Sequence, residues 1–171
     1  MDNLISIFLY YQSFLLLISG LFKLYSHENF YQNFKRLINL QLKSHHSEIM
    51  YKSITVLFSI IEIIGGLLLL IPTTQFVGIY IAITLYILAT LVINYSLITN
   101  KEQQECGCFG DIIIEKVSVS KILKNLFTLI VFIISIFIET QMEIMGIIFA
   151  GILIGSKFIL SYVNKYTILL R

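Results

Sequence analysis

The chain alternates between long apolar runs and shorter polar breaks. Five apolar runs are long enough to cross a bilayer; they cover residues 5–25, 53–71, 76–98, 122–138 and 144–163. At a rise of about 1.5 Å per residue, each run forms a helix of ~26–34 Å, which matches a hydrocarbon core of ~30 Å. The many β-branched residues do not predict strands, because a helix satisfies its own backbone hydrogen bonds in lipid. The pattern predicts an all-α, polytopic transmembrane helical bundle. It forms a single domain over residues 1–171, with a four-helix core and a fifth C-terminal span.

Two of the four predicted connections are long, and odd–even alternation places both on one side of the membrane. They cover residues 26–52 and 99–121. In the first, apolar residues recur at helical spacing between polar and basic ones; they are Phe30, Phe34, Leu37, Ile38 and Leu42. This pattern predicts an amphipathic helix at about residues 29–43 that lies in the membrane interface. A helix folded back as a lid over the bundle fits the pattern equally well.

The composition supports the membrane assignment. Hydrophobic residues make up 57% of the chain and charged residues 13%, whereas soluble domains carry about twice that charged fraction. The sequence contains no basic tract or nucleic-acid-binding motif, so the expected partner is the lipid bilayer and not a nucleic acid.

Asp2 is the only charged residue before the first apolar run, and no small-residue cleavage site follows that run. We therefore expect it to be retained as a helix.

The distribution of lysine and arginine predicts the orientation. All of these residues lie in the long connections, near the C-terminus, or toward the same side within the helices; they are Lys23, Lys35, Arg36, Lys43, Lys52, Lys101, Lys116, Lys121, Lys124, Lys157, Lys165 and Arg171. The opposite side carries only acidic residues; they are Asp2, Glu139 and Glu143. The positive-inside rule therefore places the long connections in the cytoplasm, in a multi-pass protein of the cell (inner) membrane.

The only two cysteines lie two residues apart in the second long connection, in the sequence Glu105-Cys106-Gly107-Cys108-Phe109-Gly110-Asp111. Cα atoms at this spacing are roughly 5–7 Å apart, and a disulfide needs about 4.4–6.8 Å. Gly107 and Gly110 permit the bends that bring the two sulfurs within reach. A disulfide in so small a ring is strained and therefore reactive. Cys106 and Cys108 are thus candidate catalytic residues that act as a redox pair.

Two other interpretations of the cysteines stay open. They are two reduced thiols in a tight turn, or they provide half of a tetrahedral zinc site. In the second case His27, His45 or His46 of the first long connection would complete the site. The acidic neighbours Glu105 and Asp111 are expected to raise the thiol pKa values, which argues against a strongly acidic thiolate. From the sequence we assign neither a metal nor a cofactor.

A single acidic residue, Glu62, lies at the middle of the second apolar run. An ionisable group at this depth is costly, and by default it marks a functional site or a paired charge. Lys23, near the end of the first run, lies about 10 Å closer to the same membrane surface. Two long side chains can span most of that gap if the helices touch. We expect Lys23 and Glu62 to form a buried polar pair facing the bundle interior, with a structural role favoured over a chemical one.

Together these residues resemble the MauE branch of the MauE/DoxX-like integral membrane proteins. The resemblance rests on Gly20-Leu21-Phe22-Lys23 in the first helix, on Glu62 with Gly65-Gly66-Leu67-Leu68 in the second, on Cys106-Gly107-Cys108-Phe109-Gly110 after the third and on Lys124-Asn125-Leu126 in the fourth. The cysteine motif, which includes Gly107, Phe109 and Gly110, is the specific part. The resemblance covers residues 5 to about 138, and the fifth apolar run departs from the family's usual four-helix core.

The resemblance implies a small helical bundle associated with methylamine utilisation. In that setting the family helps to mature the disulfide-rich small subunit of methylamine dehydrogenase. It also implies a thioredoxin-like or disulfide-containing partner, with Cys106 and Cys108 as the redox pair and Lys23 with Glu62 as the buried polar pair. We therefore predict a membrane protein that supports thiol–disulfide maturation of a partner, and leave open whether it is itself an enzyme.

The alternative function is a non-enzymatic membrane assembly or transport subunit whose cysteines are structural or bind a metal. The predicted orientation favours this alternative, because disulfide donors work in oxidising compartments and not in the cytoplasm.

Overall fold

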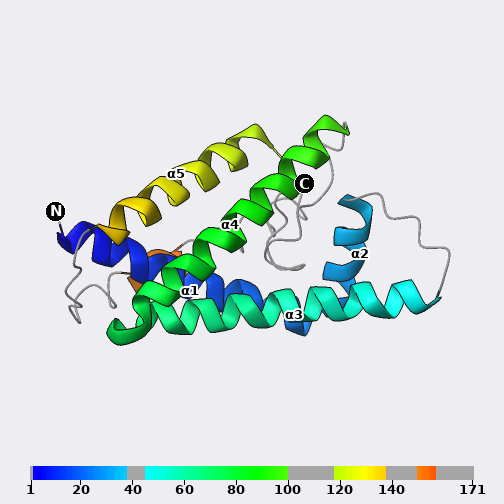
Figure 1. Cartoon of the computed structure of the whole chain (residues 1–171), viewed down its shortest axis with the longest axis horizontal. Coiled ribbons are helices and arrows are strands. Elements are labelled where there is room, and N and C mark those ends of the chain that lie inside the picture. The colour runs from blue at the N-terminus through cyan, green and yellow to red at the C-terminus, as the bar shows by residue number, and fades with distance from the viewer. Residues whose placement is uncertain (1, 38–44, 100–117, 138–149, 157–171) are drawn as a thin grey trace, which may run out of the picture.

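The computed structural model describes residues 2–37, 45–99, 118–137 and 150–156, and the regular structure in these ranges is helical (Figure 1). In chain order the elements are α1 (Asp2–Tyr25), α2 (His27–Leu37), α3 (His45–Leu70), the 3-10 turn η1 (Pro72–Thr74), α4 (Gln75–Ile98) and α5 (Val119–Ile136). Within the described residues, α1, α3, α4 and α5 are long and apolar enough to cross a membrane. The predicted all-α, polytopic architecture is confirmed.

The first four predicted spans coincide with these four helices. The largest difference is at the start of α3, which begins at His45 and not near residue 53, so that its first two turns precede the apolar run. Residues 150–156 of the predicted fifth span are helical. Residues 144–149 and 157–163 of that span lie outside the described part of the chain. A fifth crossing, and with it a single domain over residues 1–171, therefore stays a prediction.

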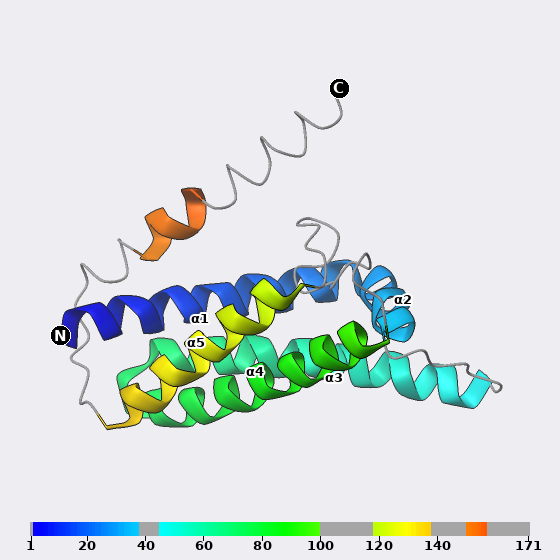
Figure 2. The same cartoon turned by 90° about the horizontal axis from the view of Figure 1, so that it is seen from above.

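The four long helices pack as a bundle in which α1 contacts α3, α3 contacts α4 and α4 contacts α5 (Figure 2). Its centre is apolar, with Leu9, Leu69 and Phe132 at most 1% exposed. Large apolar side chains such as Leu91 and Ile130 are exposed on the outside of the bundle. An apolar exterior is unfavourable in water but is the surface that lipid tails require, so the distribution of side chains agrees with a membrane-embedded bundle.

Two glycines allow α1 and α3 to approach closely. A Cβ added to Gly20 would lie 2.8 Å from the backbone oxygen of Ser59, and one added to Gly66 would lie 2.9 Å from the backbone oxygen of Ser13. The Ser13 hydroxyl donates a hydrogen bond of 2.7 Å to the carbonyl of Gly66 across the same contact. Small residues and interhelical hydrogen bonds are the usual basis of tight helix packing in lipid. The contact determines how near the polar residues of α1 and α3 come to each other.

Helix α2 lies across the end of the bundle at which α1 and α4 end (Figures 1 and 2). Phe30 and Tyr31 on its inner face are 7% and 1% exposed, and they pack toward the bundle. Glu28, one helical turn before Tyr31, forms an ion pair of 2.8 Å with Lys52 of α3. Hydrogen bonding from Lys52 lowers the pKa of the Glu28 carboxylate, while burial raises the pKa of the Tyr31 hydroxyl.

The position of α2 therefore favours the interpretation of this segment as a lid packed on the helices. It is compatible with a location at the membrane interface. Residues 38–43 of the predicted amphipathic segment lie outside the described residues.

We predict that Gly66→Ala destabilises the bundle by about 1–3 kcal/mol, because the new methyl group meets backbone atoms that cannot rotate away. Neighbouring Gly65→Ala is the matched control, since its Cβ would meet only side-chain atoms, the nearest being a methyl carbon of Ile81 at 2.8 Å. Thermal unfolding in detergent, followed by circular dichroism, measures both variants. A melting temperature of Gly66→Ala equal to that of the parent protein would show that α1 and α3 do not need their close approach.

Candidate functional site

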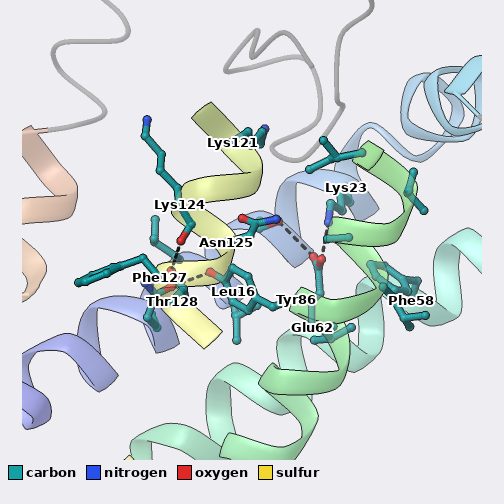
Figure 3. A pocket seen from close by; sticks show the side chains of 18 of the residues that line it. Leu16, Lys23, Phe58, Glu62, Tyr86, Lys121, Lys124, Asn125, Phe127 and Thr128 are labelled. Atoms are coloured by element: carbon teal, nitrogen blue, oxygen red, sulfur yellow. Dashed lines mark hydrogen bonds and ion pairs between the residues drawn. The ribbon is translucent and has the colours of Figure 1, made fainter. Parts of the chain in front are cut away.

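The most polar feature of the bundle interior is an ion pair between Lys23 in the last turn of α1 and Glu62 of α3. The two residues are 5% and 6% exposed. The Lys23 ammonium donates to Oε1 of Glu62, and the Ser19 hydroxyl donates to Oε2 over 3.1 Å. Figure 3 shows Lys23 and Glu62 pointing toward each other. Each charge is thus compensated inside the membrane, where an uncompensated one would be costly.

The local sequence explains this arrangement. Ser19 and Lys23 are four residues apart, so they lie on one face of α1. Gly20 lies between them and packs against Ser59 and Ile63 of α3. These two residues lie three positions before and one position after Glu62. Because the helices touch at Gly20, the lysine and glutamate side chains meet over a short distance. The structure therefore brings together the two polar residues that the sequence places in neighbouring spans.

Aromatic rings surround the ammonium group of Lys23. Its Nζ lies 5.1 Å from the ring centroid of Phe30 on α2 and 5.4 Å from that of Phe58 on α3. Both distances are within the range of a cation–π interaction, which gains strength when the cation is desolvated. Helix α2 thus contributes directly to the site, because Phe30 covers Lys23 from the end of the bundle.

The ion pair borders a cavity of about 1090 Å³ that is lined by residues of all five helices. Much of the lining is aliphatic or aromatic; these residues include Phe8, Leu15, Leu16, Phe30, Phe34, Ile54, Phe58, Leu85, Leu88, Val92, Ile93, Leu123 and Phe127. Its polar lining includes Ser19, Lys23 and Glu62 on one side and residues of α5 on the other. The site is thus a largely apolar cavity, here called the chamber, with a polar corner where the charges of Lys23 and Glu62 neutralise each other.

Further polar contacts lie around the chamber. The Tyr86 hydroxyl of α4 donates a hydrogen bond of 2.6 Å to the side-chain oxygen of Gln12 on α1. The Asn125 amide of α5 donates to Thr90 of α4 over 3.3 Å. Asn125 extends from α5 toward the side of the chamber that holds Glu62 (Figure 3), and Lys121 and Lys124 of the same helix also line the chamber. The hydrogen bonds cross-link α1, α4 and α5 around the cavity.

Lys23 and Glu62 were predictable from the sequence, whereas other residues at this site were not. Ser19 carries a signal in its spacing from Lys23, because residues four apart share a helix face. Tyr86 and Asn125 carry no comparable signal. Tyrosine is frequent throughout the chain, and which face of α4 or α5 points inward follows only from the packing.

The candidate cysteine site is not described by the structure. Cys106, Gly107, Cys108, Phe109 and Gly110 lie in the connection between α4 and α5, outside the described residues, and their roles stay predictions. Of the three histidines considered above for a zinc site, His27 lies exposed at the start of α2. Among the residues that the structure describes, no three His, Cys, Asp or Glu side chains are grouped so that they could hold a metal ion.

The comparison with known families is decisive for classification. A family model described as "Methylamine utilisation protein MauE" matches residues 1–138. The chain belongs to the MauE family. The match includes every element from α1 to α5, and therefore the whole chamber and the cysteine motif, while residues 139–171 lie beyond it. No curated protein and no solved structure matches the chain at a significant level.

Membership of the MauE family, together with the four helices able to span a membrane, makes this chain a multi-pass membrane protein of a family named for methylamine utilisation. The chamber and its ion pair are features of the MauE-like part of the chain.

We predict that Glu62→Gln is less harmful than Glu62→Lys. The amide still accepts a hydrogen bond from Lys23 or Ser19, whereas a lysine places a second cation beside the first. Loss of a buried charge partner costs about 3–5 kcal/mol in folded proteins, so Glu62→Lys should reduce the yield of folded chain and its melting temperature strongly.

The charge-swapped double variant Lys23→Glu with Glu62→Lys tests the pairing itself. It should recover part of the stability that Glu62→Lys loses, because opposite charges again face each other. A swap that is no more stable than Glu62→Lys alone would contradict a direct interaction between the two side chains.

Proposed function

We propose that this MauE-family membrane protein supports disulfide formation in a partner protein through Cys106 and Cys108. The observation that carries the proposal is the sequence Cys-Gly-Cys-Phe-Gly, which holds the only two cysteines of the chain at a spacing that suits a reactive disulfide. Membership of a family named for methylamine utilisation supports it. The partner implied by the family resemblance is the disulfide-rich small subunit of methylamine dehydrogenase.

The position of the motif in the bundle suits access by a partner. Helix α4 ends and helix α5 begins at the end of the bundle that carries α2 (Figure 2). Ser118, which immediately precedes α5, lines the same chamber as Lys23. The two described ends of the connection that contains the cysteines therefore lie at this end of the bundle, and one of them borders the chamber. A water-soluble partner reaches such a connection without entering the lipid.

The chemistry is dithiol–disulfide exchange. A thiolate of the partner attacks one sulfur of the Cys106–Cys108 disulfide, and a mixed disulfide forms while the other cysteine leaves as a thiolate. A second partner thiolate then attacks the mixed disulfide and releases the first cysteine. The partner gains one disulfide and loses two electrons, and Cys106 and Cys108 take up those electrons as two thiols. Each turnover leaves the pair reduced, so it must be reoxidised.

We predict that Cys106→Ser, Cys108→Ser and the double variant all abolish maturation of the partner while inserting normally into the membrane, because neither cysteine lies in a predicted span. The double variant should be no worse than either single one, as expected for residues that act as a unit. The measurement is the number of alkylatable thiols in the methylamine dehydrogenase small subunit coexpressed with each variant.

A variant of the partner that keeps only one cysteine of a disulfide pair offers a sharper test than loss of function. Its single thiolate can open the Cys106–Cys108 disulfide, but no second partner thiolate is present to resolve the mixed disulfide, which should persist as a higher-mass band on non-reducing gels that disappears with dithiothreitol. The double variant is the matched control and should give no band. Full maturation of the partner by the double variant would instead support the alternative of an assembly or transport subunit with structural cysteines.

The side on which the cysteines lie is tested with the Cys108→Ser variant, whose remaining Cys106 thiol cannot be masked by the internal disulfide, by labelling cells with a membrane-impermeant thiol reagent before and after lysis. Labelling in intact cells is the result expected of a disulfide donor. Labelling only after lysis would agree with the positive-inside rule and favour the alternative function.

A further inference from the structure

We propose that the chamber between the five helices binds the head group and first part of the tail of a membrane quinone. The chamber is large for a small-molecule site, since typical ligand pockets measure about 300–1,000 Å³ and this one measures about 1090 Å³. Its apolar walls lie within the membrane-spanning helices, so its occupant comes from the lipid phase. A ring with an isoprenoid tail has the shape and the polarity that these walls require.

The polar corner of the chamber selects the head group. The Lys23 ammonium carries three N–H donors, of which Glu62 takes one. A quinone carbonyl accepts a hydrogen bond from such a donor, and the hydroxyl formed on reduction donates to a carboxylate such as Glu62. Phe30 and Phe58 lie beside Lys23 and provide flat apolar surfaces for a planar ring. The corner therefore offers a donor, an acceptor and aromatic contacts within one small region.

The same corner disfavours the most abundant lipid of comparable size. A phospholipid brings a phosphate whose negative charge would approach the Glu62 carboxylate, and Lys23 is already neutralised by that residue. A quinone is uncharged and meets no such repulsion. Because the local charges of Lys23 and Glu62 cancel, this corner of the chamber suits a neutral head group that both accepts and donates hydrogen bonds. Lys121 and Lys124 of α5 also line the chamber, and a phospholipid phosphate would be attracted to them and not to this corner, so the test includes phospholipid as a competing occupant.

A quinone in the chamber would supply what the proposed function lacks, and this part of the inference rests on that function. The two thiols of Cys106 and Cys108 and one quinone give one disulfide and one hydroquinone. Two S–H bonds break, one S–S bond and two O–H bonds form, and the quinone gains the two electrons and two protons that the thiols lose. The pair is thereby reoxidised after each turnover. Quinone binding itself depends only on the described residues of the chamber.

The test uses the full chain in nanodiscs of zwitterionic phospholipid, titrated with decylubiquinone. Saturable binding, measured as quinone retained with the protein and as a rise in melting temperature, is expected. Ala89 lines the chamber, so Ala89→Trp should fill part of it and weaken binding about tenfold or more. Ile87→Trp is the matched control on the same helix, because Ile87 is exposed on the outer surface and its replacement should leave binding unchanged.

A second variant examines the polar corner without filling space. The neutral pair Lys23→Met with Glu62→Gln removes both charges and should fold, because no unpaired charge is left in the membrane. It should bind decylubiquinone about tenfold more weakly while keeping the melting temperature of the unliganded protein within a few degrees. Equal affinity in this variant, in Ala89→Trp and in the parent protein would overturn the proposal.

The outcomes separate this inference from the proposed function. The Cys106→Ser, Cys108→Ser variant should bind decylubiquinone normally but fail to reduce it with a dithiol substrate. Binding without dithiol-dependent reduction in the parent protein would uphold the quinone site and refute its redox role. Disulfide transfer to a partner without any quinone binding would refute the quinone site and leave the proposed function supported. Retention of phospholipid alone, not displaced by decylubiquinone, would also overturn the quinone site.

Discussion

Lys23 and Glu62 constrain the arrangement of this bundle, because the membrane tolerates their two charges only as a pair. The pair requires α1 and α3 to lie in contact, and the glycines at that contact make the distance short enough. Ser19 and the ring of Phe30 then complete the surroundings of the two charges. The need to neutralise the two charges is thus linked to the spacing of α1 and α3 and to the position of α2. The same pair gives the chamber a charged but compensated corner.

Much of the fold could be predicted from the sequence because the bilayer imposes simple rules. Any apolar run of about 20 residues must form a helix in lipid, and the first four runs did so with small shifts at their ends. The start of α3 was missed because its first two turns contain polar residues, and the apolar pattern does not extend through them. The Lys23–Glu62 contact was predictable because a charge in the middle of a span has few permitted surroundings. Each of these inferences follows from the cost of polar groups in hydrocarbon.

The chamber could not be predicted in the same way. Its walls are ordinary Leu, Ile, Val and Phe residues, which occur on every face of these helices, so composition and periodicity do not distinguish an inward from an outward position. The bond between Tyr86 and Gln12 joins residues 74 positions apart, and its existence depends on how three helices pack. Packing of this kind is set by the sum of many weak contacts, none of which leaves a local pattern. The cysteine motif is the opposite case, since its chemistry is evident from spacing alone while its surroundings lie outside the described residues.

The length of α3 carries its polar first turns beyond the hydrocarbon. Its 26 residues span about 39 Å, whereas the apolar part from residue 53 onward spans about 27 Å, close to a hydrocarbon core of ~30 Å. Lys52, at the end of these polar turns, holds Glu28 of α2 in an ion pair that is exposed to water. Salt weakens an exposed ion pair, so that the ionic strength of the surrounding solution adjusts how firmly α2 is held and how tightly Phe30 covers Lys23.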